Sequence, residues 1–415
     1  MRKCVLVMLA PVLVLGLVAC RPDQQMAPTV AKSVSDNYSG SEVCGGCHSS
    51  IYNQFVESGH PYTLTEVANG QKPIGLPFST LPNLPGTGMR DGDNTLGPPA
   101  SYADVSYVIG GYYWKALFID LNGYIITGAD VQYNVANHRW APFFNGVVDK
   151  PYDCGSCHTT GWVPATSTAT RKESLPGMGG NFYAGGVQCE ACHGPGAAHV
   201  NTSGDKRYIT KNTASSMCGK CHTRQDGNRI VADNGFISHH GQYDELLGLN
   251  PDNMGAGGMG KHLANGVGCN TCHNPHATTV NRHQTGSNGV VKECVECHPD
   301  RVIASGTAHS QENLANNGLL DQPSGKKITN CVACHMPKLT LSAVTTAKAG
   351  SGPYIGDIRT HIFKINLAKA EQFTADGKFS YPWTTAQYSC KQCHNGVYFF
   401  ELPVPVSYQV HRRRT

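Results

Sequence analysis

The sequence contains few charged residues, and this shortage limits the folds that it can adopt. Asp, Glu, Lys and Arg make up 15% of the 415 residues, against a usual ~25%. Exposed helices carry charged faces, so this composition argues against a domain of ordinary amphipathic helices. The apolar run at residues 5–18 is too short to span a bilayer, which takes about 20 residues. Glycine is abundant instead, with 47 residues, and favours close approaches of the backbone.

Cysteines that could form disulfide bonds are absent outside the N-terminal leader, which holds Cys4 and Cys20. The other sixteen of the eighteen cysteines lie in eight copies of Cys-x-x-Cys-His. This is the attachment signature of a c-type haem, in which the cysteines form thioethers and the histidine binds the iron. One isolated Cys-x-x-Cys would also suit zinc, but eight copies that all end in histidine predict eight covalent haems.

The copies are numbered here motif 1 to motif 8 in chain order. The predicted thioether cysteines are Cys44 and Cys47, Cys154 and Cys157, Cys189 and Cys192, Cys218 and Cys221, Cys269 and Cys272, Cys294 and Cys297, Cys331 and Cys334, and Cys390 and Cys393. The predicted proximal iron ligands are His48, His158, His193, His222, His273, His298, His335 and His394.

Eleven further histidines are enough to give every iron a second imidazole. The predicted distal ligands are His60, His199, His239, His240, His262, His276, His309 and His361. Adjacent His239 and His240 could serve two haems, or one of them could be a surface residue, and we favour both as ligands. His138 is interpreted as a polar surface residue, and the role of His283 is left open.

The spacing of His276 predicts how the haems are arranged. His276 follows His273 by three residues, which span at most about 10 Å, whereas two ligands of one iron approach from opposite faces of the porphyrin. His276 must therefore serve a different haem from His273, if it serves any. A short peptide that holds two haems in this way predicts closely spaced rings.

The leader and the spacing of the motifs predict the organisation of the chain. Leu17-Val18-Ala19-Cys20 resembles a bacterial lipobox, in which Cys20 would carry a lipid anchor, and simple cleavage near Ala27 is the alternative. The predicted units are a signal peptide (1–19), a tether (20–37), a first haem segment (38–69), a loop and β-rich insert without haem (70–150), a seven-haem region (151–395) and a C-terminal tail (396–415).

The predicted fold is mostly irregular, with short α-helices after the motif histidines and with the haems themselves as the core. Behind His48, apolar residues at helical spacing predict a helix that stops near Gly59. A small insert near residues 102–127 is the exception: residues 112–121 and 124–126 flank Asn122-Gly123 and predict a β-hairpin with a type I′ turn. We interpret the insert as a β-layer packed over haems, and a docking or self-assembly surface is the alternative.

Several stretches resemble known multihaem cytochromes. Tyr38-Ser-Gly-Ser-Glu-Val-Cys44 through Ser58-Gly59-His60 is similar to the first haem segment of the family related to the tetrahaem cytochrome of ammonia oxidisers. Cys189-Glu-Ala-Cys-His-Gly-Pro-Gly, His239-His240-Gly-Gln-Tyr243, Cys272-His-Asn-Pro-His276 and Gly356-Asp-Ile-Arg-Thr-His361 resemble segments of exported cytochromes from metal-reducing bacteria. The resemblance implies a multihaem cytochrome c fold, bis-histidine haems and electron transfer in anaerobic respiration.

Two functions fit these observations. The favoured one is an exported electron carrier, since iron with two imidazoles has no open position for chemistry. The alternative is an octahaem oxidoreductase acting on a small nitrogen or sulfur oxyanion at an open or lysine-ligated haem, and Lys261 beside His262 keeps that option open.

The expected partners are other redox proteins, extracellular electron acceptors or copies of the chain itself, together with an outer membrane reached through the lipid anchor. The location is expected to be periplasmic or at the cell surface. Haem propionates would make the mature chain negative despite its formal charge of +4, so a nucleic-acid partner is not expected.

Overall fold

The computed structural model describes residues 37–73, 81–82, 84, 98–224, 229–252, 260–279, 289–303, 305–306, 309–316, 329–343, 355–390 and 392. The predictions for the leader, for the tether up to residue 36 and for the C-terminal tail lie outside the described residues, as do those for Cys393, His394 and His283. Within the described part of the chain, no helix is long and apolar enough to cross a membrane.

The α-helices of the described residues contain four to seven residues each, so none would be stable in isolation. They are α1 (Ser41–Cys47), α2 (Ser49–Phe55), α3 (Gly155–His158), α4 (Cys189–His193), α5 (Ala197–Asn201), α6 (Ser215–Gly219), α7 (Gln242–Leu247), α8 (Lys261–Ala264), α9 (Cys269–Cys272), α10 (Cys294–Cys297), α11 (Gln311–Asn316), α12 (Asn330–His335) and α13 (Ala386–Ser389). Short 3₁₀ turns are η1 (His60–Tyr62), η2 (Ala68–Gly70), η4 (Tyr102–Asp104), η5 (Thr168–Thr170), η6 (Lys172–Ser174), η7 (Lys206–Tyr208) and η8 (Pro299–Arg301).

Most of these helices lie on the Cys-x-x-Cys-His motifs themselves rather than after the histidine. Helices α2 and α5 are exceptions: α2 follows His48 directly, as the sequence predicted, with His60 beginning the next turn just beyond Gly59, and α5 begins four residues after His193. The prediction of short helices is therefore confirmed, but in the described residues their expected position after each histidine was wrong for motifs such as those at α3 and α9.

An antiparallel sheet forms the part of the chain that carries no motif. Its strands are β1 (Leu64–Glu66), β2 (Val105–Gly110), β3 (Lys115–Asp120), β4 (Tyr124–Ile125), β5 (Gly128–Asn134), β6 (Arg139–Phe143) and β7 (Lys150–Pro151). The order is β1-β2-β3-β4-β7, with β5 paired to both β3 and β6. The insert is thus larger than the predicted hairpin near residues 102–127.

The central strand β3 is buried on both faces and gives the insert a protein core of its own. Phe118 and Ala116 pack into one apolar cluster, and Leu117 and Ile119 pack into another. The predicted haem core does not account for this insert, because the apolar residues of β3 pack into protein clusters on both faces of the strand.

The predicted hairpin is present, but its turn is not type I′. Ile119 pairs with Ile125, and the backbone N–H of Gly123 donates to the carbonyl of Asp120 at 3.1 Å. This bond makes Leu121 and Asn122 the central residues, and among residues 121–123 only Gly123 has a positive φ, of 86°. A type I′ turn needs positive φ at both central residues, so the turn resembles type I followed by a left-handed glycine.

A second, smaller sheet is formed by strands that follow motif 4 in the chain. It comprises β12 (Ile230–Asp233), β13 (Phe236–Ser238), β14 (Thr340–Leu341) and β15 (Phe379–Ser380), in the order β14-β13-β12-β15. Two short two-stranded pairings follow motif 2 in the chain, namely β8 (Thr159–Thr160) with β11 (Ala184–Gly185) and β9 (Val163–Pro164) with β10 (Gly180–Asn181).

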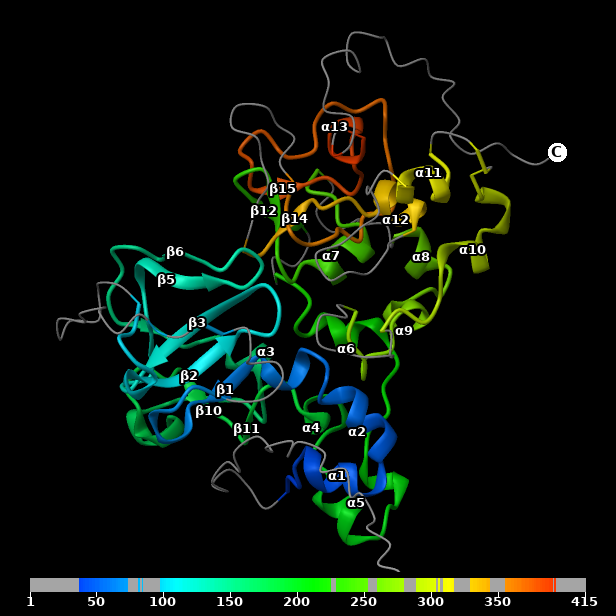
Figure 1. The fold of residues 1–415 in the computed structure, drawn as a ribbon. Helices are drawn as coiled ribbons and strands as arrows, with labels where there is room; N and C mark the ends of the chain where they lie inside the picture. Colours follow the sequence, from blue (N-terminus) through cyan, green and yellow to red (C-terminus); the bar gives the residue numbers. More distant parts are fainter. Residues whose placement is uncertain are drawn as a thin grey trace, which may run out of the picture.

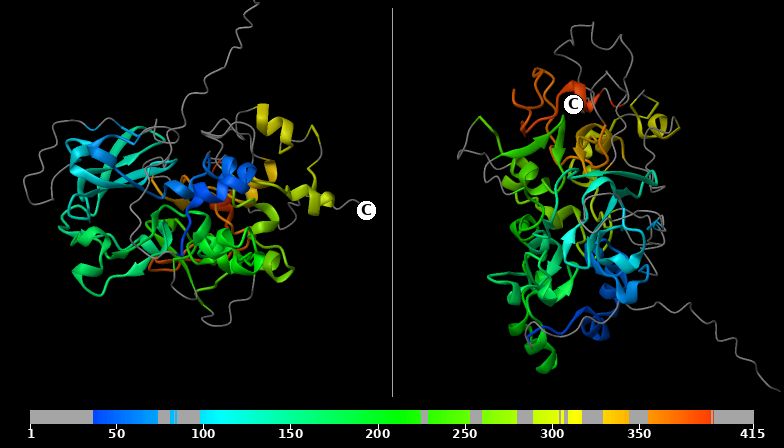
Figure 2. Two further views of the ribbon diagram at one scale, coloured as in Figure 1. Left: turned by 90° about the horizontal axis from the view of Figure 1, so that it is seen from below. Right: turned by 90° about the vertical axis from the view of Figure 1, so that its left-hand side faces the viewer.

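The helices that carry or directly precede motifs follow one another as a column in Figure 1, from α1 and α4 at one end through α6 and α9 to α12 and α13 at the other. The large sheet lies beside this column, with α3 between the sheet and α6. The view from below in Figure 2 also sets the sheet to one side of the helices.

Candidate haem-binding site

Each described motif folds as one turn of helix that gathers its three functional side chains on one side. The backbone N–H of the motif histidine donates to the carbonyl of the first cysteine, at 2.8 Å in motif 1, 3.1 Å in motif 2 and 2.9 Å in motifs 4, 5 and 6. Residues three and four apart share a helix face. The turn therefore presents both thiols and the imidazole to a single porphyrin.

Thiols of different motifs come into contact although they are far apart in sequence. The thiols of four pairs lie close enough to interact, namely Cys44 with Cys189, Cys157 with Cys221, Cys218 with Cys269, and Cys294 with Cys331. These contacts join motif 1 to 3, motif 2 to 4, motif 4 to 5 and motif 6 to 7.

Longer electrostatic interactions join the remaining neighbours. Cys192 of motif 3 contributes to the raised pKa of Cys218 and of Cys221 in motif 4. Cys294 of motif 6 contributes in the same way to the raised pKa of Cys272 in motif 5. Within motif 8, the side chain of Gln392 accepts a hydrogen bond of 3.1 Å from the backbone N–H of Lys338, just after motif 7. The motifs thus lie in the spatial order 1-3-4-5-6-7-8, with motif 2 beside motif 4.

Three motif histidines each face one imidazole from a distant segment. The ring centroids are 6.1 Å apart in each pair, which are His193 with His276, His298 with His262, and His273 with His361. An iron held by two nitrogens at about 2.0 Å each separates the two ring centroids by roughly 6 Å. The spacing therefore fits one iron between each pair.

Motifs 2 and 4 share a group of four imidazoles. His222 lies 6.3 Å from His60 and 6.0 Å from His240, and His158 lies 5.9 Å from His240. Only the combination of His222 with His60 and His158 with His240 gives each proximal histidine a partner of its own.

Backbone carbonyls orient several of these imidazoles. Nδ1 of His158 lies 3.1 Å from the carbonyl of Thr63. Nδ1 of His193 lies 2.7 Å from the carbonyl of Thr210, and Nδ1 of His335 lies 2.8 Å from that of Phe363. A carbonyl can only accept, so Nδ1 carries the hydrogen and Nε2 keeps its lone pair. This is the tautomer that an iron ligand needs, and the second hydrogen bond fixes the ring.

Burial favours the neutral form of several of the paired imidazoles, and metal ligation requires that form. Desolvation, followed by the facing His222, lowers the pKa of His60 to about 4. Desolvation likewise lowers the pKa of His361 to about 3, with His273 as the next cause.

The other predicted ligands lie outside these pairs. Nδ1 of His199 lies 3.0 Å from the Asp205 carbonyl, and the carbonyl of His309 accepts from the Asn330 side chain at 3.1 Å beside motif 7. The two ring nitrogens of His239 lie 2.9 and 3.0 Å from the Arg224 guanidinium. His138 is exposed on the β5–β6 turn, where it hydrogen-bonds Tyr133, so its interpretation as a surface residue is confirmed.

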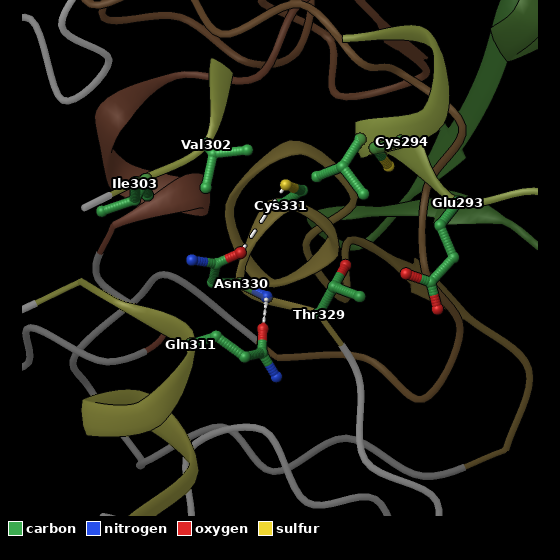
Figure 3. Close-up of a pocket in the computed structure, with 9 residues that line it drawn as sticks. Glu293, Cys294, Val302, Ile303, Gln311, Thr329, Asn330 and Cys331 are labelled. Carbon is green, nitrogen blue, oxygen red and sulfur yellow. Dashed lines mark hydrogen bonds between the residues drawn. The ribbon is translucent and has the colours of Figure 1, made fainter. Parts of the chain in front are cut away.

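A cavity of about 410 Å³ opens between motifs 6 and 7 (Figure 3). Cys294 and Cys331 line it from opposite motifs, together with the apolar side chains of Val302 and Ile303. The volume falls in the usual range of cofactor sites, ~300–1,000 Å³. Within the described residues, no three His, Cys, Asp or Glu side chains converge on a point that suits a bare metal ion.

Sequence reasoning missed the buried carboxylates that join the motif segments. Glu190, inside motif 3, accepts from the backbone N–H groups of Ser39 and Gly40, both at 2.9 Å, and of Gly196 at 2.7 Å. Glu245 accepts from the Thr360 hydroxyl at 2.7 Å and from the backbone N–H of His361. Both contacts are long-range, and no local pattern marks either glutamate.

These sites define the class of protein: the chain is a multihaem c-type cytochrome that binds c-type haem through its Cys-x-x-Cys-His motifs. Two families match parts of it, "Cytochrome c554 and c-prime" at residues 140–194 and "Doubled CXXCH motif" at residues 261–302.

A curated relative is the dissimilatory sulfite reductase MccA of Wolinella succinogenes, 25% identical over 229 residues. This alignment spans 47% of the present chain but 28% of that enzyme. The solved octahaem sulfite reductase MccA (form II) from the same organism shares the fold, with a TM-score of 0.54 and 16% identity over 88% of this chain and 67% of that one.

Two other solved structures are similar. The outer cell wall cytochrome OcwA has a TM-score of 0.48 and 20% identity over 87% of this chain and 84% of that one. The undecahaem cytochrome from the S-layer of Carboxydothermus ferrireducens has a TM-score of 0.45 and 20% identity over 89% of this chain and 59% of that one.

Proposed function

We propose that the chain carries electrons along a row of eight c-type haems. The observation that supports this proposal most directly is the contact between thiols of different motifs, such as Cys44 with Cys189 and Cys218 with Cys269. A thioether sulfur is bonded to a side group of the porphyrin, so motifs whose thiols touch carry neighbouring porphyrins. Short separations between neighbouring rings allow fast one-electron exchange.

The proposed ligand set follows from the imidazole pairs. Haem 2 takes His158 and His240, haem 3 takes His193 and His276, haem 4 takes His222 and His60, haem 5 takes His273 and His361, and haem 6 takes His298 and His262. For haems 1, 7 and 8 the remaining distal candidates are His199, His239 and His309.

When bound, bis-histidine haem supplies reversible one-electron chemistry at low potential. The protein's part is to hold the imidazoles and keep them neutral. Carbonyls such as that of Thr63 fix the ring orientation, and burial lowers the pKa of His60 and His361. The chain also crosses between motifs, since His60 follows motif 1 but faces His222 of motif 4.

Electron paramagnetic resonance of the oxidised protein tests the ligand set. We expect low-spin signals from the wild type, and we expect His276→Ala to convert one haem, haem 3, to high spin while covalent haem content is unchanged. His138→Ala is the matched control, because this exposed imidazole faces Tyr133, and it should leave the spectrum unaltered. A wild-type spectrum with a high-spin ferric haem, or no effect of His276→Ala, would contradict the proposal.

A second candidate function rests on the match to a dissimilatory sulfite reductase. In this case one haem would bind and reduce a small oxyanion. Addition of sulfite or nitrite to the reduced protein separates the two functions: re-oxidation with release of a reduced product would favour the enzyme, and no reaction would favour the carrier.

We further propose that the chain is exported and held at the outer membrane by a lipid on Cys20, because residues 17–20 resemble a lipobox. Redox proteins, extracellular acceptors or copies of the chain would then be its partners. Labelled palmitate should enter the wild type but not Cys20→Ala, and equal labelling of both would contradict the anchor.

A further inference from the structure

Two cationic side chains from different parts of the chain meet beside the imidazoles of motif 2. Lys115, on strand β3 of the large sheet, is buried enough that its pKa falls, and its Nζ donates to the Ser342 carbonyl at 2.6 Å. Arg224 follows motif 4 by two residues and places its Nη2 against the ring of His239, at 2.9 Å from Nδ1. The ring of His239 in turn lies 4.7 Å from that of His240.

The local field at these imidazoles is positive. The Arg224 Nη2 lies 2.9 and 3.0 Å from the two ring nitrogens of His239. Lys115 lies close enough to Arg224 that the guanidinium charge, after burial, lowers the pKa of Lys115.

The carboxylates that face the two cations are already engaged with the backbone. Asp357 accepts from the N–H groups of Ser342 and Ala343, both at 2.7 Å, and Asp244 accepts from the N–H of Arg224 at 2.9 Å. Lys115 keeps a pKa of about 8, because burial lowers it while Asp357 opposes that change, so it is cationic at pH 7.

We propose that Lys115 and Arg224 raise the reduction potential of the haem attached at Cys154 and Cys157, so that this haem holds electrons at a branch of the row. Reduction adds one electron to the haem, taken from its neighbour at motif 4, and nearby fixed positive charge stabilises the reduced form. The branch position follows from the contacts between motifs 2 and 4, where Sγ of Cys157 lies 3.8 Å from the Lys220 carbonyl and Sγ of Cys221 lies 4.0 Å from the Ser156 carbonyl. Because Lys115 belongs to β3, the inference also gives the haem-free insert a role.

The test is a redox titration of the haem-loaded protein, followed by visible absorbance with dithionite as reductant. We expect Arg224→Gln and Lys115→Met each to lower the potential of one haem, so that its electron exchange equilibrium with the neighbouring haem changes about tenfold, which is 59 mV for one electron. Arg224→Lys should restore the potential, because it returns the charge. Lys211→Gln, which removes an exposed cation, should change no potential.

His240→Met identifies the haem that responds, because methionine ligation changes both the spectrum and the potential of the haem that loses this imidazole. In that background, Arg224→Gln should shift the methionine-ligated haem. A shift in any other haem, or unchanged potentials in both charge variants with full haem content, would overturn the inference.

The inference rests on the proposed electron-carrying function, but the two fail differently. Unchanged potentials together with wholly low-spin haems would overturn the inference alone. An open, high-spin iron in the wild type would overturn the carrier function, whether or not the charge variants shift a potential.

Discussion

Replacement of Glu190 should loosen the junction between motifs 1 and 3. Glu190 is 4% exposed, and its carboxylate accepts three backbone N–H bonds, from Ser39, Gly40 and Gly196. A hydrogen bond to a charged group contributes about 1.5–3 kcal/mol. Since Ser39 and Gly40 are partly exposed, water can replace part of what is lost, and we expect Glu190→Ala to cost about 3–6 kcal/mol.

Hydrogen exchange is the appropriate assay, because the covalent haems keep the chain attached while this junction opens locally. A cost of 3 kcal/mol corresponds to a roughly hundredfold change in an equilibrium constant. The amide protection at Ser39, Gly40 and Gly196 should therefore fall by about a hundredfold or more in Glu190→Ala.

Two matched variants make the result interpretable. Glu190→Gln keeps one acceptor oxygen and should lose less protection than Glu190→Ala. Glu42→Ala removes an exposed carboxylate from the neighbouring helix α1 and should leave the protection unchanged. Equal protection in Glu190→Ala and the wild type would refute the reasoning that this carboxylate joins the two motifs.

Three further predictions concern other parts of the chain. His361→Met should raise the potential of one haem without loss of covalent haem, because methionine ligation raises the potential, and a titration identical to that of His138→Met would remove His361 from the ligand set. Burial raises the pKa of Glu245 to about 7, so the native state binds the extra proton and the free energy of unfolding should fall by about 3 kcal/mol as the pH rises from 4.5 to above 7; Glu245→Gln should flatten that dependence in denaturant titrations, and an equal slope would contradict the assignment. Phe118→Ala should destabilise the insert by about 3–5 kcal/mol, because Phe118 is fully buried in its core. An unchanged denaturation midpoint would show that the measured unfolding transition does not include the insert.

The sequence predicted the local elements well, because their determinants lie within a few residues. A Cys-x-x-Cys-His motif is a five-residue unit, and the α2 helix behind His48 follows from apolar spacing alone. The β-hairpin around Asn122-Gly123 was likewise predictable, but its turn type depended on register, which Ile119 and Ile125 set across the strands.

Long-range features could not be predicted from the sequence. Strand β1 at Leu64–Glu66 pairs with β2 at Tyr107–Ile109 across a long loop, and nothing in its three residues indicates that partner. The pairing of His60 with His222 has the same character, since counting histidines shows that ligands suffice but not which iron each would serve.

Iron positions from anomalous scattering in crystals of the haem-loaded protein would test the central claim most directly. The account predicts one row in which neighbouring irons follow the order 1-3-4-5-6-7-8, with iron 2 beside iron 4 and with His276 and His361 on irons 3 and 5. A wide gap within the row, or an iron that lacks a second protein ligand and faces a substrate-sized pocket, would contradict it.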